Sequence, residues 1–196
     1  EIYTLVYTLS LHDALPISES ADDAISTGSG ALADDDVNTT RVEHEVHARI
    51  NEIRSERGLQ PLRHDPELQD IARGHSQSMA TNDYLAHEAP DGDTFEDRYQ
   101  QAGYDCRVST GSNQYTTGGE NVAYTYASSD IDVDYGDTVN YNGNETKIAR
   151  GIVRGWMNSS GHRENLLQPY WENEGIGVAV SETDGRTKVY TTQNFC

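Results

Sequence analysis

Apolar side chains recur every three or four residues over several segments of the chain, which is the spacing of amphipathic helices. The first such segment contains Val42, Val46, Ile50 and Ile53. Thr40 and Glu43 have the spacing of a capping box at its start, and Gly58 supplies a stop at its end. We therefore predict a first helix that begins near Thr40 and ends before Gly58.

Three further helices are predicted from start and stop signals. Asp65-Pro66 combines an N-cap residue with proline at the first helical position. A short third helix, entered at Asp93-Thr94, is expected from Phe95 to Ala102, and a fourth helix begins at Asn144 or Thr146 and ends before Gly161. The apolar stripe of the second helix consists of Leu68, Ile71, Ala72, His75 and Met79.

Alternating apolar and polar positions predict strands in the C-terminal part. Ile176, Val178 and Val180 alternate within residues 175–182, Asp184-Gly185 is a hairpin signal, and residues 187–195 return as a second strand. A further strand is expected over Asn121–Tyr126. Helices that flank a small antiparallel sheet make a layered α+β domain.

Composition divides the 196 residues into three zones. Residues 1–18 lack Lys and Arg, and YTLSLHDALPIS resembles a translated sequencing adapter, so we interpret this segment as non-native. Residues 19–40 contain six acidic residues and no basic one, which is typical of a disordered linker. Residues 41–196 form the predicted folded domain.

Charge excludes several function classes. The chain has 33 Asp and Glu against 14 Lys and Arg, a net charge of −19, which argues against binding to nucleic acid or anionic membranes. No run of 18 apolar residues is present, so no transmembrane helix is expected. An acidic, lysine-poor composition favours a halophilic protein, because at molar salt the Debye length is only about 3 Å and carboxylate repulsion is screened. An ordinary acidic secreted protein is the alternative.

Three titratable residues are set at loops or helix ends, where chemistry is often placed. His87 precedes a turn rich in Pro, Asp and Gly, Glu120 follows two glycines that permit close backbone approach, and His162 follows Gly161. A neutral imidazole is a metal ligand or a general base near neutral pH, and a carboxylate can orient it or share a cation. Each residue alone is more simply a solvated loop side chain or a helix-end residue.

All three residues lie in segments that resemble one known protein family. The segments YLAHEAPDG, RYQQAGY, GGENVAY, GWMNSSGHRENLL and GIGVAV, followed by TTQNF, resemble the CAP superfamily, also called the SCP or cysteine-rich secretory protein, antigen 5 and pathogenesis-related family. The resemblance covers residues 42–195 and is closest to the short prokaryotic branch. The acidic composition suggests an origin in a halophilic archaeon.

The resemblance implies an α-β-α sandwich whose cleft holds His87, Glu120 and His162. In many eukaryotic members a second glutamate lies where this chain has Ser159, so the acid/histidine site is incomplete. Two histidines open to water suit a divalent metal such as Zn²⁺, and no organic cofactor is expected. We expect a secreted or cell-surface monomer that binds a metal ion and a peptide, glycan or lipid. The alternative is a metal-assisted or acid/base hydrolase that uses the same three residues.

The other histidines have simpler interpretations. His75 lies on the apolar stripe of the second helix, so we expect a core-facing histidine, with a supporting position behind the cleft as the alternative. His44, His47 and His64 are expected at the surface, on or beside the first helix.

The two cysteines predict one disulfide. A Cys106–Cys196 bridge would close a ring of ~90 residues, stabilise the fold by roughly 4 kcal/mol and indicate an oxidising compartment. Two free thiols are the alternative. Residues 106–118 and 128–143 are expected to be polar loops, and the carboxylates of the second loop, which lack an EF-hand pattern, are expected to be solvated rather than Ca²⁺ ligands.

Overall fold

A four-stranded mixed sheet forms the middle of the domain. The computed structural model describes residues 37–111, 113–127, 130–133, 137–140 and 144–196. The strand order is β1-β7-β8-β4, and β7, β8 and β4 are antiparallel, whereas the short β1 pairs with β7 in parallel. The strands span Arg63–His64 (β1), Gly119–Tyr126 (β4), Asn173–Thr183 (β7) and Arg186–Phe195 (β8).

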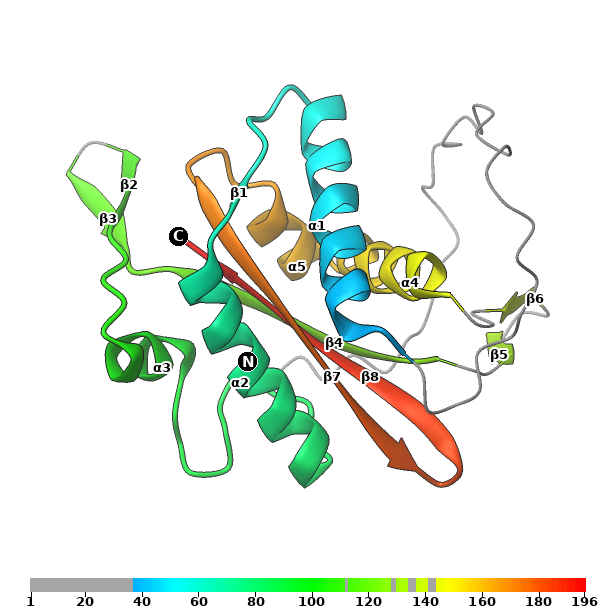
Figure 1. Cartoon of the computed structure of the whole chain (residues 1–196). Coiled ribbons are helices and arrows are strands. Elements are labelled where there is room, and N and C mark those ends of the chain that lie inside the picture. The colour runs from blue at the N-terminus through cyan, green and yellow to red at the C-terminus, as the bar shows by residue number, and fades with distance from the viewer. Residues whose placement is uncertain (1–36, 112, 128–129, 134–136, 141–143) are drawn as a thin grey trace.

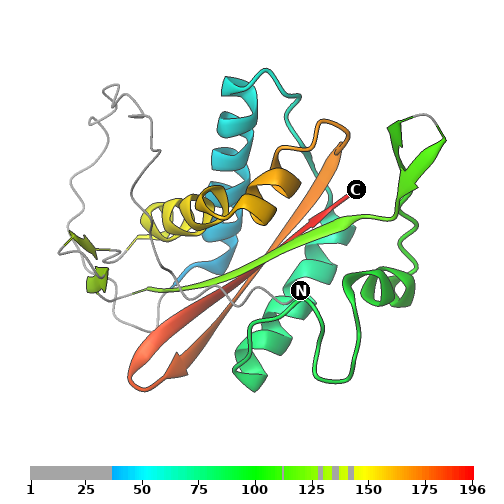
Figure 2. The ribbon, with the colours of Figure 1, turned by 180° about the vertical axis from the view of Figure 1, so that it is seen from behind.

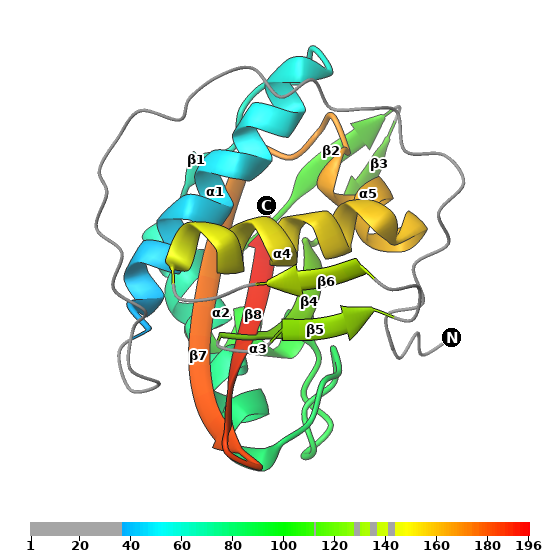
Figure 3. The ribbon, with the colours of Figure 1, turned by 90° about the vertical axis from the view of Figure 1, so that its right-hand side faces the viewer.

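Helices cover both faces of this sheet. Figure 1 shows the strands running diagonally between α2 (Pro66–Asn82) and α3 (Phe95–Ala102) on one side and α1 (Thr39–Glu56), α4 (Glu145–Asn158) and α5 (Ser160–Leu166) on the other. Figure 3 shows α1 and α4 crossing over the same face. The layered α+β prediction is confirmed, except that β1 makes the sheet mixed rather than wholly antiparallel.

Two apolar cores fill the spaces between the layers. The larger core lies between the sheet and the α1/α4 layer and includes Ile50, Ile152, Trp156, Ile176 and Phe195. On the α2 face, one cluster is built around Met79 and Tyr190, and another around Leu68 and Tyr99. Each face of the sheet therefore buries its own set of side chains, as two layers of helices require.

The helix boundaries follow their capping residues. Asp65 and Thr94 cap α2 and α3 as predicted, and Asn144, the first of the two alternatives, caps α4. The proposed Thr40 capping box is wrong, because the side chain of Asn38 accepts from the Arg41 amide and the helix begins at Thr39. The last two residues assigned to the linker are thus helical, while residues 1–36 lie outside the described part of the chain.

Both segments expected to be loops contain short antiparallel strand pairs. Val108–Gly111 (β2) pairs with Gln114–Thr116 (β3), and Asp130–Val133 (β5) pairs with Asp137–Asn140 (β6). The side chains of residues 128–143, including the acidic ones, lie outside the described part. At the base of the β2–β3 hairpin, which stands clear of the sheet in Figure 1, Cys106 forms the predicted disulfide with Cys196.

Two glycines of β7 bring α2 into direct backbone contact with the sheet. A Cβ atom at Gly175 would collide with the backbone of Leu68 and Gln69, and one at Gly177 with the backbone of Ala72 and Arg73. These positions therefore set how closely α2 packs on β7, and with it the height of the following loop above the sheet.

A polar network crosses the opposite face and corrects one sequence prediction. His47 is not a simple surface residue: its Nδ1 donates to Glu174 Oε1 at 2.6 Å, and Glu174 is completely buried. Gln193 donates to the other Glu174 oxygen at 2.6 Å, and Asn121 donates to Gln193 at 3.0 Å. The prediction failed because Glu174 is more than a hundred residues away in the chain. His44 and His64 are exposed, as expected.

We expect Gly175→Ala to destabilise the domain by about 3 kcal/mol or more, because α2 must move away from β7 to admit the methyl group. Gly74→Ala is the matched control. Gly74 lies in α2 with open space at its Cβ position, so the change should stabilise by about 0.5–1 kcal/mol. Urea unfolding of both variants measures the difference, and equal midpoints would show that the close packing is not required.

His47 should make stability depend on pH. Its hydrogen bond to Glu174 raises the pKa of His47 despite partial burial. A raised pKa gives stability that is complete below about 6.5, the unfolded value, and is lost as the pH rises through the folded value. The stability advantage of the wild type over His47→Gln should therefore be larger at pH 6 than at pH 9 in urea unfolding. An equal advantage at the two pH values would contradict a role for the His47–Glu174 bond in this dependence.

Candidate functional site

The three predicted site residues meet at the start of the edge strand β4. Successive side chains of a strand point to opposite faces. Glu120 contacts groups of the α2 and α3 layer, whereas Asn121 donates to the His162 carbonyl of α5 at 3.4 Å. Seen from behind, β4 lies in front of the other strands, with α4 and α5 above it and α3 below (Figure 2). The site thus forms where two helical layers meet around one sheet edge.

A buried carboxylate organises the α2 side of the site. Glu120 has a side chain only 1% exposed, and its Oε1 accepts from His87 Nδ1 at 3.0 Å. Its Oε2 accepts from Arg98 at 2.6 Å. His87 itself is 54% exposed, so an accessible imidazole is held from behind by a carboxylate removed from water.

The glycines before Glu120 allow the close approach that the sequence indicated. A Cβ atom at Gly118 would lie 2.7 Å from the Tyr99 ring, and one at Gly119 would lie 2.9 Å from Trp171 and 3.0 Å from Asn165. Gly118 also has a φ of 129°, which only glycine adopts readily. The chain can therefore enter β4 between two aromatic rings and deliver Glu120 to the cleft.

His162 reaches the site from the other layer. It lies in the first turn of α5, a short helix that the sequence analysis did not predict, since it placed His162 just after the end of the fourth helix. Asn165, on the same helix, donates to the Glu120 carbonyl and to Asn121, each at 3.2 Å. These bonds fix α5 against the start of β4. Desolvation, with a smaller repulsion from His87, lowers the pKa of His162 to about 4, so the ring is neutral at physiological pH.

The rings of His87 and His162 lie close to each other. Their ring centroids are 6.3 Å apart, with 46° between the ring planes. Two imidazoles that share a tetrahedral zinc ion each hold a nitrogen about 2.0–2.1 Å from it, which places the centroids about 5 Å apart. Sharing an ion therefore requires the rings to close by ~1 Å. His87 Nδ1 is committed to Glu120, which leaves Nε2, and His162 Nδ1 has no hydrogen-bond partner in the described structure.

Glu120 does not complete a metal site, because both of its oxygens are already engaged. Among the described residues, no group of three or more His, Cys, Asp and Glu side chains is arranged to hold a metal ion. A divalent ion would thus take two protein nitrogens and leave its other positions to water or a ligand. Ser159, the replacement for the second family acid, joins α4 to α5 and makes no side-chain capping bond.

His75 is both a core-facing histidine and a residue behind the cleft, the two alternatives that the sequence left open. Its side chain is buried, and Nε2 donates to the Ala86 carbonyl at 2.9 Å, as a core histidine should. The same nitrogen lies 3.9 Å from Glu120 Oε1, so His75 also stands directly behind the cleft. Burial lowers the pKa of His75, which keeps the ring neutral.

Sequence reasoning missed three polar residues that hold the site together. Arg98 binds Glu120, and Asn121 and Asn165 connect β4 to α5. All three lie within the segments that carry the family resemblance, but single polar side chains on a short helix or a strand have no spacing that predicts their partners.

Comparison with known proteins decides the family. The model of the cysteine-rich secretory protein family, CAP, matches residues 47–195. The chain belongs to this family. YlbC, a membrane protein of Bacillus subtilis, is 28% identical over 80% of the chain, and YkwD of the same species is 31% identical over 71%. The chain spans only 34% and 43% of the length of these two relatives.

Solved structures of other bacterial proteins have a similar fold. An extracellular protein containing an SCP domain from Bacillus anthracis is 28% identical, with a TM-score of 0.55 over 85% of the chain and 44% of its own length. An outer surface protein from Borrelia burgdorferi is 18% identical, with a TM-score of 0.56 over 81% of the chain and 95% of its own length, and supports the fold alone. These bacterial proteins give no support to the halophilic archaeal origin that composition suggested.

Among the described helices, none is both long and apolar enough to cross a membrane. The similar structures include proteins named as extracellular or surface proteins.

We expect the His162 ring to titrate with a midpoint near pH 4, because burial and the neighbouring His87 oppose its protonation. Its imidazole resonances in an NMR pH titration should therefore stay unchanged between pH 8 and pH 5.5. A His162 midpoint near 6.5 would contradict the desolvated setting.

Proposed function

We propose that this CAP domain is a secreted or cell-surface binding module whose cleft takes a divalent metal ion, Zn²⁺, through His87 and His162. The observation that carries the proposal is the pair of imidazoles with centroids 6.3 Å apart at an accessible edge of the sheet. Water or a polar group of a peptide, glycan or lipid would fill the remaining coordination positions. The extracellular SCP-domain protein that the chain resembles supports this location.

The engagement of Glu120 favours binding over hydrolysis. A general base must offer a free oxygen to the proton that it removes. Glu120 is almost completely buried, and its two oxygens accept from His87 and Arg98. Its role in this proposal is to orient His87, as carboxylates behind metal-binding histidines commonly do.

The acidic composition supports a second part of the proposal, that the module works in salt. The chain has a net charge of −19, and high ionic strength reduces the repulsion among its carboxylates by screening them. The composition concerns the surroundings in which the protein works and not the chemistry of the cleft.

Calorimetric titration of the full chain with zinc chloride tests the metal site. We expect one ion per chain, with affinity reduced at least ~10-fold in His87→Ala and in His162→Ala, because each change removes a coordinating nitrogen. His44→Ala is the control, since His44 is an exposed histidine of α1 outside the cleft, and its affinity should be unchanged.

Two results would overturn the proposal. Zinc binding that survives loss of both cleft histidines would assign the ion to the acidic surface. Turnover of peptide, ester or glycan substrates by the zinc-loaded chain, abolished in His87→Ala and Glu120→Ala, would replace the binding module with a hydrolase.

A further inference from the structure

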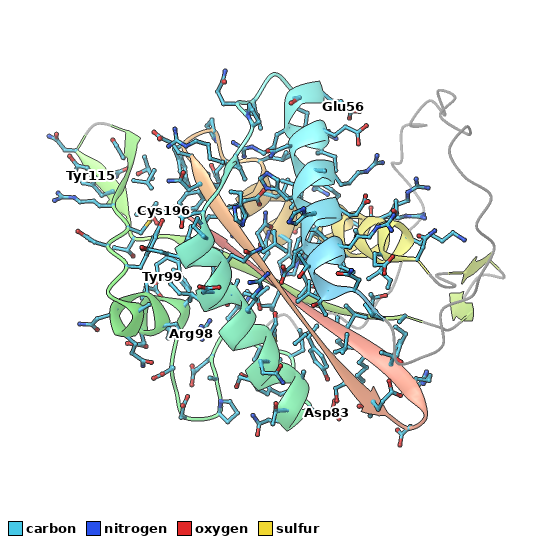
Figure 4. All side chains as sticks on the ribbon, viewed as in Figure 1. Glu56, Asp83, Arg98, Tyr99, Tyr115 and Cys196 are labelled. Carbon is cyan, nitrogen blue, oxygen red and sulfur yellow. A yellow bond between two sulfur atoms is a disulfide. The ribbon has the colours of Figure 1, made fainter. Side chains whose placement is uncertain are left out.

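Arg98 of α3 contacts both halves of the His87–Glu120 pair. One terminal nitrogen, Nη2, donates to Glu120 Oε2 at 2.6 Å and to the His87 carbonyl at 3.1 Å. The other, Nη1, donates to the Asp93 carbonyl at 2.9 Å. The side chain is only 11% exposed and lies between α3 and α2 (Figure 4). One guanidinium thus holds the carboxylate and two points of the loop that carries His87.

The neighbouring histidine does not replace this cation. His75 Nε2 lies 3.9 Å from Glu120 Oε1, but its proton is donated to the Ala86 carbonyl. Burial also keeps His75 neutral by lowering its pKa. Among the described groups within ion-pair distance of Glu120, Arg98 is therefore the one that is charged at every physiological pH.

The contact fixes which nitrogen of His87 carries the proton. A carboxylate paired with a guanidinium is ionised and can only accept hydrogen bonds. Because Glu120 Oε1 lies 3.0 Å from His87 Nδ1, that nitrogen must be the donor. In the neutral ring the lone pair then resides on Nε2, which has no partner in the described structure.

We propose that Arg98 is a positioning residue of the cleft: it holds Glu120 and the His87 carbonyl with one nitrogen, fixes His87 in the Nδ1–H tautomer and presents the Nε2 lone pair to the space shared with His162. What Nε2 binds rests on the proposed function. The tautomer of His87 and its dependence on Arg98 are independent of the proposed function.

Imidazole nitrogen chemical shifts from long-range ¹H–¹⁵N NMR spectra at pH 7.5 test the proposal. The wild type should show His87 as the Nδ1–H tautomer, and Arg98→Gln should show a mixture of both tautomers. Arg98→Lys restores the charge but cannot reach all three acceptors, so it should give an intermediate population. Arg63→Gln is the matched control, because it removes an exposed Arg63–Glu172 pair of 2.9 Å outside the cleft.

Zinc titration of the same variants is the second measurement. Loss of a residue that orients a metal ligand typically lowers affinity 10–100-fold. We expect a reduction in that range for Arg98→Gln, a smaller one for Arg98→Lys and none for Arg63→Gln.

The outcomes separate this proposal from the proposed function. A tautomer that depends on Arg98 in a chain that binds no zinc would reject the metal site and keep the positioning role. An Nε2–H tautomer in the wild type, or an unchanged tautomer and affinity in Arg98→Gln, would overturn the role of Arg98. Should Arg98→Gln fail to fold, Arg98→Lys decides, and a wild-type tautomer population in that variant would equally overturn it.

Discussion

The close packing of α2 on β7 is the constraint on which the rest of the molecule depends. Gly175 and Gly177 leave no room for a side chain, so the helix backbone rests directly on the strand. This contact sets the height of α2 above the sheet. His75 on the helix and the loop that follows it then lie at the level of Glu120 on β4. The cleft geometry is therefore inherited from a backbone contact made two strands away.

Two buried carboxylates stand on opposite faces at the same end of the sheet. Glu120 supports His87 on one face, and Glu174 accepts from His47 on the other. Between them, Gln193 and Asn121 form a continuous series of hydrogen bonds across three strands. Burying a carboxylate costs free energy unless its oxygens accept hydrogen bonds. Glu120 and Glu174 each accept hydrogen bonds from two side chains. The hydrogen bonds of these buried side chains thus order the end of the sheet at which the cleft lies.

The sequence predicted what depends on neighbours in the chain. Helix caps such as Asp65 and Thr94, the Asp184-Gly185 turn and the strand over residues 175–182 were predicted from local signals, and the structure confirms them. The alternation itself does not hold, because residues 174–179 are buried on both faces and Val180 is 40% exposed. The structure also brings together His87, Glu120 and His162, which the family segments had indicated. The sequence did not predict which side chains form hydrogen bonds with these residues.

Those partners are separated from the residues they serve by long stretches of chain. Arg98 lies 22 residues from Glu120, and Glu174 lies 127 residues from His47. No periodicity in a single sequence encodes such pairs. The short helix α5 was missed for a different reason, since Ser159 precedes it without a side-chain cap that would mark its start.

Because the cleft lies at an edge strand, the distance between its two histidines is coupled to the spacing of the two helical layers. His87 belongs to the α2 and α3 layer and His162 to the α4 and α5 layer, and the edge strand β4 lies between them. Their separation therefore measures the spacing of the two layers at that edge. Any ligand that bridges both rings would add a link between the two helical layers at this edge, where Asn165 and Arg98 already bind each layer to β4. Occupancy of the cleft and stiffness of the domain would then rise together.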